Sequence, residues 1–228
     1  MAAATARLAK AAGASVVAIA RHAGELDDVY LGDLTDAETA RGAVRHCVER
    51  FGRIDCLFNV AGISARRLGD GPIHTCTEEA WDVTMDTNLK SMFLLSRETL
   101  KVMIEKRRGV ILNMASIAPT RPSPRYFDTH AYAVSKGAVI AMTRVMAAYY
   151  APHGIRVNAI APALVRTKLT QRSQDNPEIM DYLRQRQPLA EGMIDADDVA
   201  RAAVFLLSDE SRMITGETLT VDAGWSVT

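Results

Sequence analysis

The sequence is poor in cysteine, has no long apolar run and carries no excess of either charge. Its cysteines, Cys47, Cys56 and Cys76, include no C-x-x-C pair, so we predict reduced core or helix residues in a cytoplasmic protein, without a disulfide framework or a metal site. No stretch of about 18 apolar residues occurs, so we expect no membrane-spanning segment. Lys and Arg number 27, as do Asp and Glu, which leaves no basic field for nucleic acid. Small molecules or cofactors are the expected partners.

The first twenty residues resemble a targeting segment in composition. Arg7 and Lys10 precede an apolar run at 16–20 without an acidic residue, as in leader peptides. We interpret them instead as a helix, a turn at Gly13 and a buried strand, because the rest of the chain continues in that style.

Short apolar stretches alternate with amphipathic stretches along the chain. Thr35 and Glu38 fit a capping box at the start of one helix, and Gly52 ends it. The alternation predicts a single α/β domain over 1–228, a Rossmann-like doubly wound parallel sheet with both faces of its strands buried and ligands at the strands' carboxyl ends. Strands are predicted over 15–20, 28–32, 54–62, 109–116, 155–162 and 217–224, and helices over 2–12, 36–51, 78–106, 130–150 and 196–208.

Two stretches are predicted to be irregular, and both follow strand ends. The first, 119–130, is rich in Pro and Arg, and the second, 163–194, reads as a substrate lid. Met180, Tyr182 and Leu183 are candidate apolar walls of the pocket. Arg121 and Arg125 are candidates to meet an anionic substrate, with a solvated loop as the alternative interpretation.

A tyrosine and a lysine lie four residues apart in YAVSK, at the start of a predicted helix. The spacing places Tyr132 and Lys136 on one face, so the ammonium can favour the ionised phenol of a general acid/base; an exposed helical pair is the alternative. Ser116 ends a predicted strand and can bond to a substrate oxygen, or simply cap a helix. Asn88 can hold water for a proton path, or serve as an ordinary polar group within a helix.

Six segments, taken in order, resemble the short-chain dehydrogenase/reductase (SDR) family over essentially the whole chain. They are NVAG (59–62), DTNLKSMF (86–93), NMAS (113–116), YAVSK (132–136), HGIRVNAIAPALVRTKL (153–169) and ITGETLTVDAGWSV (214–227). The resemblance implies that Tyr132 exchanges a proton with the substrate oxygen and that Ser116 holds that oxygen. It also implies that Lys136 lowers the pKa of Tyr132 and binds the nicotinamide ribose, while Asn88 supports a water relay.

The same resemblance implies a nicotinamide cofactor. Asp33 corresponds to the residue that touches the adenine, although a turn before a helix explains it equally well. The predicted strand 15–20, which corresponds to the second strand of the family, ends at Ala20 and Arg21 without a carboxylate. This favours NADP and leaves NAD possible, because Arg can bind the extra phosphate; a solvated Arg21 is the alternative. The implied cofactor residues are Arg21, Asp33, Leu34, Asn59, Ala61, Gly62, Tyr132, Lys136, Pro162, Val165 and Thr167.

The sequence departs from the family pattern in three places. Ala163 stands where Gly is more usual, and the interval between Ser116 and Tyr132 is longer. The family begins with a strand and a Gly-rich turn that bind the pyrophosphate, whereas this sequence contains no G-x-x-x-G-x-G. We therefore expect an N-terminally truncated domain whose first central strand is absent, with unpaired buried groups costing about 1–3 kcal/mol each.

Three explanations of that departure stay open: a natural start further upstream, a truncated paralogue, or a repaired sheet that binds cofactor weakly. The predicted function is hydride transfer between a nicotinamide cofactor and a secondary alcohol or ketone. The alternative is a catalytically inactive paralogue that acts as a binding or assembly subunit. An epimerase or dehydratase also uses the Tyr and Lys pair, but this length leaves no room for its substrate domain. The resemblance further implies a homotetramer or dimer, formed through the long helices and the C-terminal strand.

Overall fold

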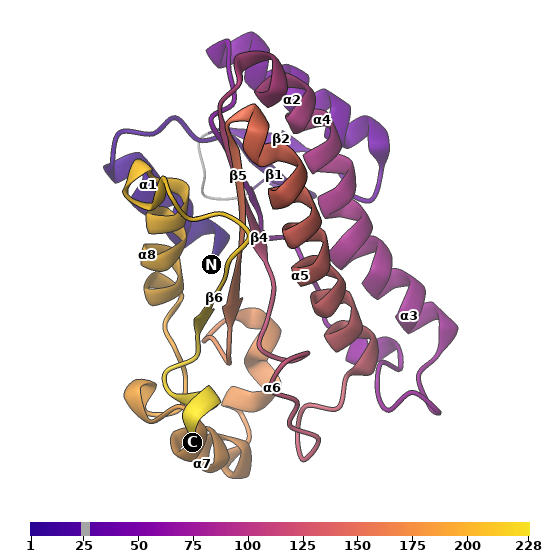
Figure 1. The fold of residues 1–228 in the computed structure, drawn as a ribbon. Coiled ribbons are helices and arrows are strands. Elements are labelled where there is room, and N and C mark those ends of the chain that lie inside the picture. The colour runs from indigo at the N-terminus through magenta and orange to yellow at the C-terminus, as the bar shows by residue number, and fades with distance from the viewer. Residues whose placement is uncertain (24–27) are drawn as a thin grey trace.

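The computed structural model describes residues 1–23 and 28–228 and contains alternating helices and strands, as the sequence predicts (Figure 1). The helices are α1 (Ala2–Ala11), α2 (Ala37–Phe51), α3 (Glu78–Met85), α4 (Ser91–Lys106), α5 (His130–Tyr150), α6 (Gln171–Gln174), α7 (Pro177–Arg186) and α8 (Ala196–Leu207). The strands are β1 (Ala18–Ala20), β2 (Val29–Leu31), β3 (Cys56–Asn59), β4 (Gly109–Met114), β5 (Ile155–Pro162) and β6 (Thr218–Val221).

All strand pairs are parallel, and the described strands form two sheets. One contains β1 and β2, and the other has the order β3-β4-β5-β6. In Figure 1, α1 and α8 lie on one side of the strands, and α3, α4 and α5 lie on the other. The central strands β4 and β5 are almost wholly buried, as expected for strands covered on both faces.

The prediction of strands buried on both faces is wrong for β1, β2, β3 and β6, whose residues are mostly half-buried. These strands are short and have a neighbour on one side only. Helices α2 and α4 hold the smaller sheet in place, because Ile19 of β1 packs against a cluster that includes Ala40 of α2 and Leu94 of α4. Separately, Arg7 of α1 pairs with Asp197 of α8 at 2.6 Å.

The start of α2 corrects the predicted capping box. The N-cap is Asp36, whose side chain accepts a hydrogen bond from the Glu38 N–H at 3.0 Å. Thr35 lies one residue before the N-cap, and its N–H and hydroxyl both donate to the Asp33 side chain. Gly52 ends the helix in the left-handed conformation with φ of 71°, as predicted.

The predicted long helix at 78–106 is interrupted where the site lies. A single π-helical turn, η2 (Asp86–Lys90), separates α3 from α4 and contains Asn88. Such turns are rare and occur often at functional sites.

The lid is the clearest difference from the sequence-based expectation. It consists largely of short helices: η4 (Lys168–Thr170), α6, α7 and η5 (Pro188–Ala190). Asn176 caps α7 by accepting from the Ile179 N–H, and Pro177 occupies the first helical position. This Asn-Pro pair is a helix-start signal that could have revealed α7 in the sequence.

The remaining composition-based expectations concern cysteines, membranes and metals. The three cysteines are free, but none is in the core, since Cys56 is exposed and the other two are half-buried. None of the described helices is long and apolar enough to cross a membrane. Residues 1–23 and 28–228 contain no group of three or more His, Cys, Asp or Glu that could hold a metal ion.

Candidate active site

The predicted catalytic side chains meet beyond the carboxyl end of β4. Ser116 follows this strand by two residues and is 8% exposed. Tyr132 lies in the first turn of α5, near enough to Ser116 for the serine hydroxyl to favour ionisation of the phenol and so lower its pKa. Lys136, one turn further along, is 2% exposed and lies with its Nζ 5.8 Å from the centre of the Tyr132 ring. The structure therefore brings these three residues together from two elements.

Burial controls the ionisation of the pair. Desolvation raises the pKa of Tyr132 above its ordinary value, and the nearby Ser116 hydroxyl acts in the opposite direction. Desolvation also lowers the pKa of Lys136 to about 8, so most of its ammonium groups are charged at neutral pH. The ammonium donates to the Met114 carbonyl at 2.7 Å. Contrary to the expectation that Lys136 lowers it, the pKa of Tyr132 is raised here, because desolvation outweighs the opposing effect.

Asn88 holds the turn that follows β3. Its Oδ1 accepts from the Ile63 N–H at 2.8 Å, and its Nδ2 donates to the Ile63 carbonyl at 3.0 Å and to the Ser135 hydroxyl at 3.1 Å. Ser135 in turn donates to the Tyr132 carbonyl at 2.7 Å. Asn88 thus connects the turn at 61–63 to the helix that carries Tyr132, and its part in a water relay stays a prediction.

Gly62 lies close to the side chains of Asn88 and Lys136. A Cβ atom on Gly62 would lie 3.2 Å from Asn88 Oδ1 and 3.4 Å from Lys136 Nζ. Gly62 itself is exposed, and Ala61 is half-buried. The backbone after β3 therefore approaches the Lys136 ammonium closely, with an open side toward solvent.

Asn59 has a different role from the one the sequence suggests. Its side chain is 4% exposed and donates to Ser96 Oγ and to Asn113 Oδ1, both at 2.9 Å. Asn113 then donates to Thr143 Oγ1 at 2.9 Å. This buried chain of hydrogen bonds joins α4, β3, β4 and α5, so the Asn59 side chain supports the sheet, and its backbone alone is left for a cofactor contact.

The predicted adenosine end lies at the carboxyl ends of β1 and β2. Arg21 directly follows β1, and its charge helps to lower the pKa of Asp33, although hydrogen bonds from Thr35 are the larger cause. Asp33 is exposed and Leu34 is half-buried. The hydrogen bonds from Thr35 match the interpretation of Asp33 as a turn residue before a helix. Its place near Arg21 is also compatible with the predicted contact with the adenine.

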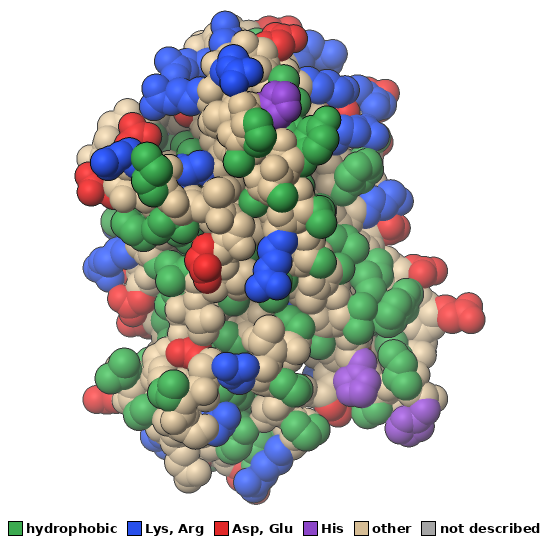
Figure 2. Space-filling model, viewed as in Figure 1, with side chains coloured by type: hydrophobic (Ala, Val, Ile, Leu, Met, Phe, Trp, Pro, Cys, Tyr) green, Lys and Arg blue, Asp and Glu red, His purple; other side chains and the backbone are tan. Residues whose placement is uncertain are grey.

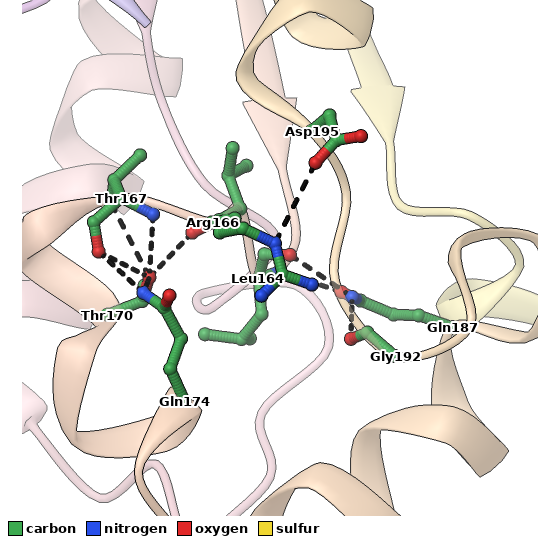
Figure 3. A network of polar contacts seen from close by, with 9 residues as sticks. Leu164, Arg166, Thr167, Thr170, Gln174, Gln187, Gly192 and Asp195 are labelled. Carbon is green, nitrogen blue, oxygen red and sulfur yellow. Dashed lines mark hydrogen bonds and ion pairs between the residues drawn. The ribbon is translucent and has the colours of Figure 1, made fainter.

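The segment after β5 is held by a buried glutamine (Figure 3). Gln187, at the end of α7, is fully buried; its Oε1 accepts from the Leu164 N–H at 2.7 Å, and its Nε2 donates to the carbonyls of Leu164 and Gly192 at 3.1 and 2.6 Å. Pro162 and Val165, on either side of Leu164, are buried. Gln187 therefore fixes the predicted nicotinamide segment to the lid.

Thr167 is part of a second group of contacts in the same view (Figure 3). Its backbone N–H donates to Thr170 Oγ1 at 3.2 Å, and its carbonyl accepts from Gln174 Nε2 at 2.8 Å. The half-buried Thr167 is thereby placed by the first two short helices of the lid.

The predicted irregular stretch 119–130 lies against the lid and contains no helix or strand up to residue 129, while His130 begins α5. Ser123 Oγ and Tyr182 Oη are 2.7 Å apart. Tyr182 also packs against Tyr126 and Trp225, with ring centres 5.3 and 5.9 Å apart. An aromatic cluster thus connects the insertion, α7 and the C-terminal turn.

Two sequence-based ideas about this region need revision. Leu183 is fully buried in the main core, so it is not a pocket wall; Met180 and Tyr182 are half-buried beside that core. Arg121 and Arg125 are exposed, and the Arg125 guanidinium lies 5.0 Å from the centre of the Tyr126 ring. Their environment matches the solvated-loop alternative, and a contact with an anionic substrate stays a prediction.

Sequence reasoning missed two buried polar residues that support the site, Asp70 and Gln187. Asp70 is 3% exposed and accepts from the backbone N–H groups of Ala131 and Tyr132. Each residue acts on a segment far away in the sequence, so neither local spacing nor periodicity reveals it. The turn-forming run GDGP at 69–72 indicates only that the chain reverses there.

Comparisons with known proteins fit this geometry. A family model described as Enoyl-(Acyl carrier protein) reductase matches residues 1–226. Dehydrogenase/reductase SDR family member 6 of Xenopus laevis is 36% identical over 195 residues, covering 83% of this chain and 76% of the relative. The chain belongs to the SDR family. As a member, it is an NAD(P)-dependent oxidoreductase of the alcohol/ketone type.

Other SDR proteins are similar over most of the chain. D-threitol dehydrogenase of Mycolicibacterium smegmatis is 37% identical over 196 residues, covering 86% of this chain and 72% of the relative. A crystal structure of gluconate 5-dehydrogenase from Burkholderia cenocepacia, in complex with NADP and tartrate, superposes with a TM-score of 0.90 at 30% identity; the match covers 99% of this chain and 91% of the other. The fold prediction, a single α/β domain of SDR type with parallel sheets, is thus confirmed.

Proposed function

We propose that this SDR protein interconverts a ketone and a secondary alcohol with NADP as the preferred cofactor and Tyr132 as the general acid/base. The observation that carries the proposal is the meeting of Tyr132, the buried Ser116 and the buried Lys136 beyond the carboxyl end of β4, with Lys136 Nζ 5.8 Å from the centre of the Tyr132 ring. In parallel α/β sheets, this is where ligands bind.

The residues around Lys136 fit a nicotinamide ribose. The ammonium has three N–H donors, and within the described residues it donates to the Met114 carbonyl. Because a buried ammonium is stabilised when its N–H groups are hydrogen-bonded, the remaining N–H groups of Lys136 favour binding of ligand hydroxyl oxygens. The Gly62 backbone lies close to Lys136, and a Cβ atom there would come within 3.4 Å of Lys136 Nζ and crowd that side of the ammonium. We infer that Lys136 and Tyr132 hold the ribose, and that the backbone at 162–167 borders the nicotinamide ring.

The chemistry assigned to the protein is proton transfer and orientation. When bound, the cofactor supplies or accepts the hydride. Tyr132 Oη donates a proton to the carbonyl oxygen during reduction, and Ser116 holds that oxygen by a hydrogen bond. The raised pKa of Tyr132 keeps its proton in place at neutral pH, which suits the donor role. In the reverse direction the phenolate accepts the alcohol proton, and Lys136 stabilises the charge.

Arg21 supports the preference for NADP. It is exposed at the carboxyl end of β1, within electrostatic reach of Asp33 at the end of β2. A guanidinium at this position can bind a phosphate on the adenosine ribose by charge-assisted hydrogen bonds. We therefore propose that Arg21, Asp33 and Leu34 form the adenosine end of the site.

An exposed apolar face supports the proposed homo-oligomer, a dimer or tetramer. Apolar side chains gather over α5 in the space-filling view (Figure 2). Large apolar residues on α4 and α5 remain substantially exposed, namely Phe93, Val134, Val145 and Tyr149. Rows of this kind on neighbouring helices are typical of subunit interfaces.

A titration of the purified chain with NADPH and NADH, followed by a panel of ketones, tests the function. We expect NADPH to bind and to be oxidised only when a ketone is present, and we expect Tyr132→Phe to abolish oxidation while it retains NADPH binding. Arg21→Ala should weaken NADPH binding about tenfold or more, the effect of a lost charged hydrogen bond, and leave NADH binding unchanged. Full activity of Tyr132→Phe, or no binding of either cofactor, would contradict the proposal. Binding without turnover on any ketone would instead favour a binding or assembly subunit.

A further inference from the structure

The helix that carries Tyr132 does not cap its own start. The first intrahelical hydrogen bond of α5 runs from the Ala133 N–H to the Thr129 carbonyl, so the N–H groups of His130, Ala131 and Tyr132 need partners elsewhere. The Thr129 side chain makes no capping bond, and the first turn contains no acidic residue. The usual local means of stabilising a helix start are therefore missing at the catalytic tyrosine.

A distant turn supplies all three partners. Asp70 Oδ1 accepts from the Ala131 N–H at 2.9 Å, and Asp70 Oδ2 accepts from the Tyr132 N–H at 3.0 Å. The adjacent Gly71 carbonyl accepts from the His130 N–H at 3.2 Å. Because the Asp70 side chain is buried, 3% exposed, water does not compete for these bonds. A carboxylate at this end also interacts favourably with the helix dipole.

The turn that presents Asp70 is itself tightly fixed. Gly69 has a φ of 103°, a left-handed conformation that side chains rarely adopt. A Cβ atom there would lie 2.7 Å from Thr77 Cγ2, and Thr77 Oγ1 donates to the Leu68 carbonyl at 2.7 Å. The Asp70 N–H donates to the Ala65 carbonyl at 3.1 Å. The carboxylate is therefore anchored from both sides and holds α5 from a rigid position.

We propose that Asp70 is a positioning residue for the reaction, whose carboxylate sets the first turn of α5 and thereby places the Tyr132 phenol against Ser116. The inference rests on the proposed function, because only a reacting Tyr132 makes its position matter for the rate. Both carboxylate oxygens are needed, since the two N–H groups belong to consecutive residues. An asparagine has a single side-chain oxygen, so it can accept from one of the two N–H groups, and its NH₂ group would face the other N–H without a hydrogen bond.

The test compares Asp70→Asn, Asp70→Ala and a matched control, Asp36→Ala. Asp36 also caps a helix, by accepting from the Glu38 N–H at 3.0 Å, but it serves α2. We expect kcat per folded protein to fall about 10²-fold in Asp70→Ala, as for a reacting group displaced by about 1 Å. The kcat of Asp70→Asn should lie between that of Asp70→Ala and that of the parent protein. KM for the ketone should stay within about twofold, since the lost interaction acts on the transition state.

Hydrogen–deuterium exchange gives a readout that does not need activity. Peptides that cover 129–136 should exchange faster in both Asp70 variants than in the parent or in Asp36→Ala. Unchanged exchange in this segment, or a kcat that falls no further than in Asp36→Ala, would overturn the inference. If the parent oxidises no NADPH, the proposed function fails by itself, and the exchange data still decide whether Asp70 holds the start of α5.

Discussion

Lys136 is the residue whose chemistry depends most on the fold. The sequence places it one helical turn from Tyr132, and the structure confirms that spacing. Its consequence differs from the expectation because both groups are desolvated: the pKa of Tyr132 is raised, and the pKa of Lys136 is lowered to about 8. Spacing can show that two side chains share a face, but it contains no information on how much water surrounds them.

The buried ammonium makes stability depend on pH in a definite direction. Because the pKa of Lys136 is about 8 in the folded chain and 10.5 ordinarily, the unfolded state binds more protons between these values, so this residue makes stability rise with pH. Compared with Lys136→Met, the parent should gain on the order of 2–3 kcal/mol in the free energy of unfolding from pH 7 to pH 10. Urea denaturation of both proteins at each pH measures this difference, in which other titrating groups cancel. A difference that stays constant with pH would contradict the burial of a charged Lys136.

Among the elements, α7 shows how the lid is held. Gln187 occupies the end of this helix and makes three side-chain hydrogen bonds to backbone atoms of Leu164 and Gly192 (Figure 3). Replacing it by Leu leaves the Leu164 N–H and the Gly192 carbonyl without this partner, which should cost about 2–4 kcal/mol. Thermal or urea unfolding measures the loss. Gln185→Leu, the same change at an exposed position of α7, is the matched control and should change stability by less than about 0.5 kcal/mol; equal effects of the two substitutions would refute the role of Gln187.

The elements also show how far the sequence leads. Long helices with a clear apolar period, such as α2 and α5, are predicted almost to the residue, and the buried strands β4 and β5 follow from their apolar runs. The helices of the lid are not predicted, because helices as short as α6 and α7 bury few residues and leave a weak periodic signal. The site residues Ser116, Tyr132 and Lys136 are predictable because neighbouring motifs carry them. Asp70 is not, since its partners lie about sixty positions further along the chain.

At the scale of the whole molecule, the division of the strands into two sheets suggests two levels of stability. In the described chain, β1 and β2 pair only with each other and contain three residues each. Isolated two-stranded sheets are marginally stable in water, so this pair depends on its packing against α2 and α4 to attach it to the rest. The strands β4 and β5, in contrast, are buried and have hydrogen-bonded neighbours on both sides.

We therefore expect native-state hydrogen exchange to separate the two sheets. Amides of β1 and β2 should open with free energies several kcal/mol below those of β4 and β5, whose protection should approach the global free energy of unfolding, about 5–15 kcal/mol. The half-buried edge strand β6 is the internal control, because it belongs to the larger sheet and should show intermediate protection. Equal protection of all four strands would mean that α2 and α4 join the sheets into one cooperative unit. Since Arg21 and Asp33 follow β1 and β2, NADPH should raise the protection of these two strands more than that of β6 if they form the adenosine end of the site.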